Sequence, residues 1–184
     1  MAPEKTLTKK QKSRQKIMHA AKGLFEAQGI DSVTFTQIAQ EADVCRTTVF
    51  NHFAGTKELL LAIFSQEIDD LAEYCEETGL SGKVLIYALF DRLIEDTAYY
   101  PSLSARLLSN AILSGQEPNP ITRIEEITAA NLPETAGSLS AMLICGAYYG
   151  LINHYYINNK KFEAETMKQE FHGMLETILG GSND

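Results

Sequence analysis

FTQIAQEADVCRTTVFNHFAGTKELL, residues 35–60, is the stretch of sequence that decides the fold of this chain. It contains two short helical patterns separated by a break. Ile38 and Ala42 share one helix face in the first pattern, and Val49 and Phe53 form the inward stripe of the second. A bracing helix followed by a helix with a free outward face is the pattern of a helix-turn-helix, whose second helix enters a DNA groove.

The outward face of the second helix carries short hydrogen-bonding side chains, an aromatic ring and a cation. Such side chains can reach base edges, thymine methyl groups or phosphate oxygens. An ordinary solvated face explains them less well, because an exposed phenylalanine beside threonines and an asparagine is a poor solubility surface. We expect base or near-base contacts from Arg46, Thr47, Thr48, Asn51 and His52. We expect contacts that position the protein on the DNA backbone from Thr36, Gln37, Phe50 and Lys57.

Three segments, IMHAAKGLFEAQGIDSVTFTQIAQEADV, TTVFNHF and KELL, give the first third of the chain a family resemblance. In order and spacing they resemble the DNA-binding domain of the TetR family of transcriptional regulators. The resemblance implies a homodimeric repressor whose larger carboxy-terminal domain senses a small molecule. Three positions depart from the usual pattern: Cys45 stands where a serine-like N-cap is common, Phe50 where a tyrosine offers a hydroxyl to phosphate, and Thr56 where a lysine is common. We therefore expect a weaker N-cap at Cys45.

The formal net charge of −8 is divided unevenly along the chain. Residues 1–57 carry +4, and residues 58–184 carry −12. A basic end joined to an acidic body predicts nucleic-acid binding that is confined to one end of the molecule.

The fold class predicted is all-α, with about nine helices, three before Ala54 and six after it. No run shows sustained strand alternation. We expect a helix-turn-helix DNA-binding domain over residues 1–55, in which residues 1–10 are polar and disordered. The basic string TKKQKSRQK, residues 8–16, leads into the first helix, where it either follows a phosphate backbone or reaches a minor groove, or is merely solvated. An effector-binding and dimerisation domain follows over residues 56–184. Its helices are expected at residues 56–78, 83–98, 102–114, 119–131, 135–158 and 162–179.

The second domain is rich in apolar helix positions, which predict a mostly apolar pocket for a lipophilic or aromatic ligand. Candidate lining residues are Tyr87, Phe90, Leu107, Met142 and Tyr149. A filled core without an effector would use the same residues, so this alternative stays open. In the resembling family the last two helices form the dimer interface, and small residues let helices approach closely. Candidate interface residues are Gly146, Gly150, His154, Phe171 and Leu175, although some of them can pack inside one subunit.

Motifs for catalysis, metal ions and cofactors are absent from the sequence. None of the four histidines has a glutamate three residues before it, and there is no zinc-spaced histidine pair, P-loop, G-x-G-x-x-G or G-x-S-x-G. We therefore expect no enzyme, no metal and no cofactor. The three cysteines lie far apart, and neither a signal peptide nor a membrane span is recognisable, which favours a cytoplasmic protein.

The sequence therefore predicts a dimeric repressor that binds double-stranded DNA at an inverted repeat and is released by a small lipophilic molecule. The alternative is an all-α ligand-binding or scaffold protein without specific DNA binding. Phe50, Thr56 and the overall acidity motivate that alternative.

Overall fold

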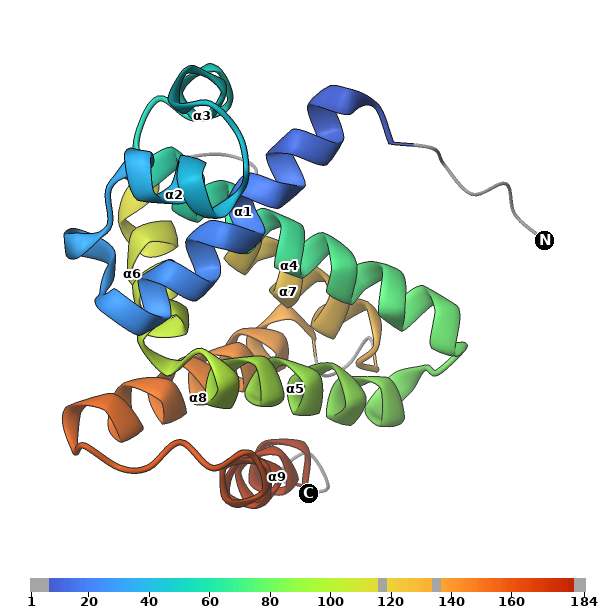
Figure 1. The fold of residues 1–184 in the computed structure, drawn as a ribbon. Coiled ribbons are helices and arrows are strands. Elements are labelled where there is room, and N and C mark those ends of the chain that lie inside the picture. The colour runs from blue at the N-terminus through green and yellow to red at the C-terminus, as the bar shows by residue number, and fades with distance from the viewer. Residues whose placement is uncertain (1–6, 116–118, 134–136, 181–184) are drawn as a thin grey trace. The chain divides into compact units, whose positions relative to one another are not determined.

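The computed structural model of the chain describes residues 7–115, 119–133 and 137–180 (Figure 1). Within these ranges the chain forms nine α-helices, one short 3-10 helix and no strand, so the predicted all-α class is confirmed. The chain divides into two compact units, residues 1–63 and 64–184. The division falls inside one continuous helix, α4 (Thr56–Thr78), whereas the predicted boundary lies just before that helix.

The first unit begins with three α-helices and a 3-10 turn, which precede the first turns of α4. Their bounds are α1 (Lys9–Gln28), η1 (Ile30–Ser32), α2 (Phe35–Glu41) and α3 (Arg46–His52). Both α2 and α3 pack against α1 and against each other. The side chains at this junction are almost fully buried: Ile17, Ala21, Phe25, Ile38, Val49, Phe53 and Leu59. Burial of each large apolar side chain contributes about 1.5–3 kcal/mol, so this junction holds the unit together.

The first helix starts earlier than the sequence predicts. The Thr8 hydroxyl accepts a hydrogen bond from the Gln11 backbone N–H, and the Gln11 side chain accepts one from the Thr8 N–H. This reciprocal capping box satisfies two donors at the helix start. The expectation that residues 1–10 are disordered is therefore wrong for Lys9 and Lys10, which are helical, while residues 1–6 lie outside the described residues.

A tight turn separates α2 from α3. Asp43 adopts a left-handed backbone with φ of 53°, which aspartate tolerates better than most residues. The turn is closed by the Val44 N–H, which donates to the Ala39 carbonyl at 3.0 Å. Cys45 then occupies the N-cap of α3 without a side-chain capping bond, as its replacement of a serine predicts.

The second unit contains the remaining turns of α4 and five further helices. These are α5 (Gly82–Tyr99), α6 (Pro101–Ser114), α7 (Pro120–Ala130), α8 (Gly137–Ile157) and α9 (Ala164–Gly180). All five are predicted from the sequence to within a few residues, and residues 135–136 of the helix expected at 135–158 lie outside the described part. Pro101 is the first residue of α6 and so separates it from α5.

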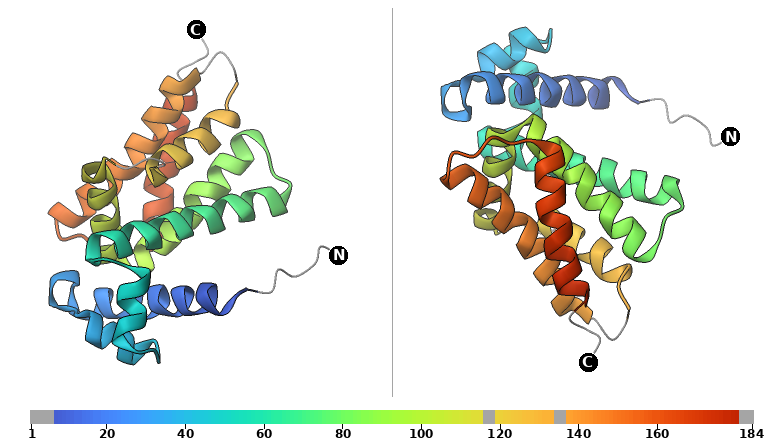
Figure 2. Two further views of the ribbon diagram at one scale, coloured as in Figure 1. Left: turned by 90° about the horizontal axis from the view of Figure 1, so that it is seen from above. Right: turned by 90° about the horizontal axis from the view of Figure 1, so that it is seen from below.

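In the second unit, helix α8 packs against α6, α7 and α9 (Figure 2). Helix α5 in turn packs against α6 and α9. Three aromatic rings form the contact between α5, α8 and α9. The Phe90 ring lies 4.9 Å from that of Phe171 and 5.7 Å from that of Tyr148. These tilted and edge-on ring pairs add to area burial and fix the three helices against one another.

Candidate nucleic-acid interface and ligand cavity

The outward face of α3 carries three exposed polar side chains, Arg46, Thr47 and Asn51. They are exposed because Val49, which is 0% exposed, and Phe53 anchor the opposite side of the helix in the core. Side chains of these three types can read base edges when a helix lies in the major groove. The structure therefore places three of the predicted base-contact residues on one accessible surface.

Phe50 lies on the same surface and is 46% exposed. Its ring is 5.1 Å from the ring of Phe35 at the start of α2, and the Arg46 guanidinium lies 5.3 Å from its centre. The cation therefore stacks on an aromatic face that also joins α2 to α3. Phe50 supplies area and shape at this surface, but no hydroxyl.

Thr48 is also on α3, and its hydroxyl is bound within the protein. The Thr48 Oγ1 atom lies 2.9 Å from the Cys45 Sγ atom. Hydrogen bonds with Thr48 lower the pKa of the exposed Cys45 thiol. The bond with the Thr48 side chain has the larger effect, and the bond with its backbone the smaller. Thr48 therefore supports the start of α3 as well as facing outward.

His52, at the end of α3, is joined to the first helix. Its Nε2 atom lies 2.8 Å from Ser13 Oγ, and its backbone carbonyl accepts a hydrogen bond from Arg14 Nη1 at 3.4 Å. Burial lowers the pKa of His52, and the charges of Arg14 and Lys10 lower it further. The neutral imidazole is thus favoured in the free protein.

The residues predicted to contact the DNA backbone are placed differently from one another. Thr36 and Lys57 are exposed. The side chain of Gln37 completes a capping box with Thr34, and its Nε2 atom donates to Gln28 at 3.1 Å. Gln37 is therefore committed to the start of α2, where it orients the backbone of that helix.

A hollow beside α3 contains residues of the basic lead-in, which were not among the individually named contact residues. It is lined by Lys9, Lys10 and Ser13 of α1 and by Thr48, Asn51 and His52 of α3. The sequence signal was the basic run at residues 9–16, whose lysines the sequence alone could not connect to particular α3 residues. The capping box at Thr8 is what makes these lysines part of a rigid helix.

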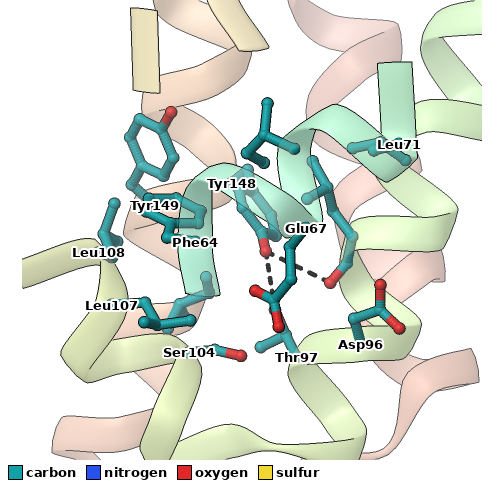
Figure 3. Close-up of a pocket in the computed structure, with 13 residues that line it drawn as sticks. Phe64, Glu67, Leu71, Asp96, Thr97, Ser104, Leu107, Leu108, Tyr148 and Tyr149 are labelled. Carbon is teal, nitrogen blue, oxygen red and sulfur yellow. Dashed lines mark hydrogen bonds between the residues drawn. The ribbon is translucent and has the colours of Figure 1, made fainter. Parts of the chain in front are cut away.

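The second unit contains a small cavity between α4, α5, α6 and α8 (Figure 3). Its volume is about 40 Å³. The lining is largely apolar: Phe64, Ile68, Leu71, Leu93, Leu107, Leu108, Tyr148, Tyr149 and Ile152, with Glu67, Asp96, Thr97 and Ser104. Of the five predicted lining residues, Leu107 and Tyr149 are in this set.

One end of the cavity is polar. The Tyr148 hydroxyl lies 2.7 Å from Thr97 Oγ1 and donates to the Leu93 carbonyl at 3.3 Å. The carboxylate of Glu67 lies beside this pair in Figure 3. Burial raises the pKa of Tyr148, so its hydroxyl stays protonated. The two acidic residues in the lining, Glu67 and Asp96, were not expected in an apolar pocket.

The hydroxyl of Tyr149 is buried and has no hydrogen-bond partner among the described residues. Burial raises the pKa of this phenol, so it remains a neutral donor. An unsatisfied buried hydroxyl costs about 1–3 kcal/mol, so it is available to a ligand or a water molecule. Because Tyr149 also lines the cavity, it is the strongest candidate for a polar contact to a bound molecule.

The other three predicted pocket residues lie outside this cavity. Phe90 is 0% exposed in the core, and Tyr87 packs edge-on against His172 with ring centres 4.7 Å apart. Met142 is 53% exposed on α8. The residues that suggested an apolar pocket are therefore divided among the core, the surface and the cavity.

The predicted interface residues fall into two groups. Gly146, Gly150 and His154 are exposed at intervals of four along α8. Phe171 and Leu175 of α9 are 0% exposed and belong to the core of the single chain. The exposed face of α8 also carries large apolar side chains: Leu139, Met142, Leu143 and Ile157. In the chain taken alone, this surface is apolar and uncovered.

Neither a metal centre nor a membrane span is found in the described part of the chain. Its residues form no group of three or more histidine, cysteine, aspartate or glutamate side chains that could hold a metal ion. None of the described helices combines the length and apolar character needed to cross a membrane.

Comparison with known proteins gives matches to bacterial transcriptional regulators. Residues 17–63 match the family described as bacterial regulatory proteins, tetR family. The regulator SrpR of Pseudomonas putida is 33% identical over 90 residues, which cover 47% of this chain and 42% of SrpR. The chain thus spans less than half of the length of that relative. The regulator TtgW, also of Pseudomonas putida, is 33% identical over 90 residues, covering 47% of this chain and 67% of TtgW.

Solved structures extend the similarity to both units. The crystal structure of FadR from Bacillus subtilis, in complex with stearoyl-CoA, has a TM-score of 0.65 and covers 91% of this chain and 98% of that chain. Its sequence identity is 17%, so the likeness is one of fold.

Proposed function

Because the chain belongs to the TetR family of transcriptional regulators, we propose that it is a homodimeric repressor released from its DNA operator by a small lipophilic ligand. The observation that carries the proposal is the outward face of α3. There, Arg46, Thr47 and Asn51 are exposed on a helix whose other side is locked into the core. The scaffold alternative is not favoured, because the segment that matches the family is the DNA-binding one.

In the proposed complex, α3 lies in the major groove and these three residues contact base edges. Thr36, Phe50 and Lys57 lie at the DNA backbone. Thr48 and His52 hold α3 in place, because their polar atoms are engaged with Cys45 and Ser13. Gln37 acts through the start of α2, which its side chain caps.

The exposed face of α8 supports a dimer. Gly146 and Gly150 leave room for a second helix, since no atom beyond the backbone of their own helix turn and their chain neighbours lies within 4 Å of where their Cβ atoms would be. The neighbouring apolar side chains Leu143 and Ile157 would be covered by the partner copy. In this arrangement Phe171 and Leu175 support the interface from the core. A two-fold dimer predicts an inverted-repeat operator with half-sites about 34 Å, or one helical turn, apart or a multiple of it.

A gel-shift titration with the promoter region beside its own gene tests DNA binding. The expected result is a complex that survives an excess of random duplex at moderate salt. If no fragment competes better than random duplex, the repressor proposal is wrong. Arg46→Ala should abolish the preference for the operator over random duplex. Arg123→Ala, an equal charge change in the second unit, should preserve this preference.

The cavity beside Tyr149 is the proposed effector site. Drug-sized ligands occupy pockets of about 300–1,000 Å³, so a cavity of about 40 Å³ must widen to accept one. Phe64 and Glu67 of α4 form part of its wall, and the first turns of the same helix belong to the DNA-binding unit. A ligand that widens the cavity therefore favours a different placement of α4. It weakens DNA binding by its differential affinity for the two states.

A thermal-shift screen of lipophilic compounds, followed by operator-release assays, tests this site. Compounds that raise the melting temperature should also release the DNA. Leu107→Trp, which fills the cavity, should abolish both effects while operator affinity is retained. Hits that stabilise the protein but leave operator affinity unchanged would contradict the release mechanism and leave the DNA-binding proposal standing.

A further inference from the structure

The hollow beside α3 brings together the first turns of α1 and the last turn of the recognition helix, two segments about forty positions apart in sequence. Lys9, Lys10 and Ser13 form one side of it, and Asn51 and His52 form the other, with Thr48. Two of its six lining residues are lysines, and none is acidic. The hollow is open to solvent and lies directly beside the exposed Asn51.

The two sides are held in a fixed relation by contacts between α1 and the end of α3. Ser13 Oγ and His52 Nε2 are 2.8 Å apart. The Arg14 guanidinium lies 4.5 Å from the centre of the Phe53 ring and donates to the His52 carbonyl. The lysines are therefore attached to a helix that is rigidly joined to α3, rather than to a flexible arm.

The chemistry of the lining fits a phosphate group. Ammonium groups and hydroxyl and amide donors are the side chains that bind phosphate oxygens in protein–DNA complexes. The charged groups around His52 are mainly positive. Lys9, Lys10 and Arg14 come from α1. Glu58, near the start of α4, is acidic, and its carboxylate accepts a hydrogen bond from the Ala54 N–H.

We propose that this hollow binds one phosphodiester group of the operator backbone, contacted by Lys10 and Ser13 of α1 and by the imidazole of His52. The proposal rests on the DNA-binding function proposed above and adds α1 to the interface. Lys9 and Asn51 border the same group. The contact fixes the distance between the DNA backbone and the end of α3, and so positions Asn51 over the bases.

A bound phosphate changes the charge that faces His52. In the free protein, burial and the positive charges of Arg14 and Lys10 hold the pKa of His52 below its ordinary value. A phosphate in the hollow adds negative charge and raises that pKa in the complex. Binding is then accompanied by proton uptake, so DNA affinity rises as the pH falls through the interval between the two pKa values.

The first test compares Lys10→Ala with Lys12→Ala as a matched control. Lys12 is an exposed lysine on the same helix, about 200° around the axis from Lys10, and it does not line the hollow. Binding is measured by fluorescence anisotropy across a salt series, on operator and on random-sequence duplex. Lys10→Ala should lower affinity about 3- to 10-fold on both duplexes and reduce the salt slope by about 0.9, the value for one phosphate. Lys12→Ala should leave the slope within error of the wild type.

The second test measures operator affinity between pH 8 and pH 6. The wild type should bind several-fold more tightly at the lower pH, and His52→Gln should lose that dependence. His19→Gln, which changes an exposed histidine of α1 outside the hollow, should retain it. Circular dichroism and melting temperatures establish that each variant is folded.

Equal salt slopes for Lys10→Ala and Lys12→Ala would overturn the proposed phosphate site, as would an unchanged pH dependence in His52→Gln. Both outcomes leave the repressor proposal intact, provided that the wild type still prefers its operator. Conversely, loss of sequence preference in the wild type overturns the repressor proposal. In that case the salt slopes measured on random duplex alone decide whether the hollow binds a phosphate.

Discussion

The Tyr148 hydroxyl and the Thr97 hydroxyl lie 2.7 Å apart between α8 and α5, and both residues are almost fully buried. Tyr148 also donates to the Leu93 carbonyl, so its oxygen is fully used as donor and acceptor. This pair fixes the register of α8 on α5 at the wall of the cavity. Buried polar pairs of this kind are costly to break singly and cheap to replace together.

A double-mutant cycle should show this coupling. Thr97→Val and Tyr148→Phe should each lower the free energy of unfolding by about 1 kcal/mol, because each leaves a buried polar group less satisfied. The double variant should lose less than the sum, with a coupling of about 0.5–1.5 kcal/mol. Urea unfolding, followed by a probe in the second unit, measures all four proteins. If the effects of the two single substitutions simply added in the double variant, the proposed coupling of Thr97 and Tyr148 would be wrong.

Alkaline pH should destabilise the second unit through Cys145. Burial raises the pKa of this thiol from 9.0 to about 12. Its neutral form is stabilised by folding, so the contribution is complete below pH 9 and is lost as the pH rises towards about 12. The slope approaches about 1.4 kcal/mol per pH unit for this one group. Cys145→Ala should flatten the decline of stability measured from pH 8 to pH 11, and parallel curves would contradict the prediction.

Phe50→Tyr should tighten DNA binding. The ring is partly exposed beside Arg46, so a hydroxyl at its tip meets solvent in the free protein and can meet a phosphate in the complex. One added hydrogen bond is worth about 0.5–1.5 kcal/mol, or about 2- to 12-fold in affinity. The salt slope should stay the same because the added donor is neutral. Unchanged affinity would show that Phe50 does not lie at the backbone.

Gly146→Leu should prevent dimerisation without unfolding the single chain. The glycine is exposed on α8 with open space around it, so a leucine fits the single chain and improves helix propensity by about 0.8–1 kcal/mol. In the proposed dimer the same side chain obstructs the partner helix. Sedimentation should therefore show a folded monomer. Gly23→Leu on α1, where the surroundings are equally open, should remain dimeric. A dimeric Gly146→Leu protein would place the interface elsewhere.

The helix-turn-helix could be predicted because the apolar residues of its second helix follow a regular helical spacing. The four-residue spacing of Val49 and Phe53 leaves the intervening outward residues no choice of face. The position of Lys9 and Lys10 was missed, although the Thr8–Gln11 capping pattern is readable in the sequence. Their neighbours on α3 were not readable, since pairing α1 with the end of α3 depends on tertiary packing.

The ligand cavity and the dimer surface could be predicted only in part. Periodicity shows that Phe171 and Leu175 share a face of α9, but not whether that face meets its own core or a partner. The structure places both in the core. Likewise, Phe90 and Leu107 have the same apolar character, and only packing separates the core residue from the cavity-lining one. The unpaired hydroxyl of Tyr149 has no signature in sequence at all.

The most direct test of the repressor account is selection of bound sequences from a random duplex library, followed by measured affinities. We predict an inverted repeat, bound by two protomers at least about 10³-fold more tightly than random duplex at physiological salt. Scrambling one half-site should remove most of that preference. Recovery of no common sequence, or a selected duplex bound no better than random DNA, would contradict the account.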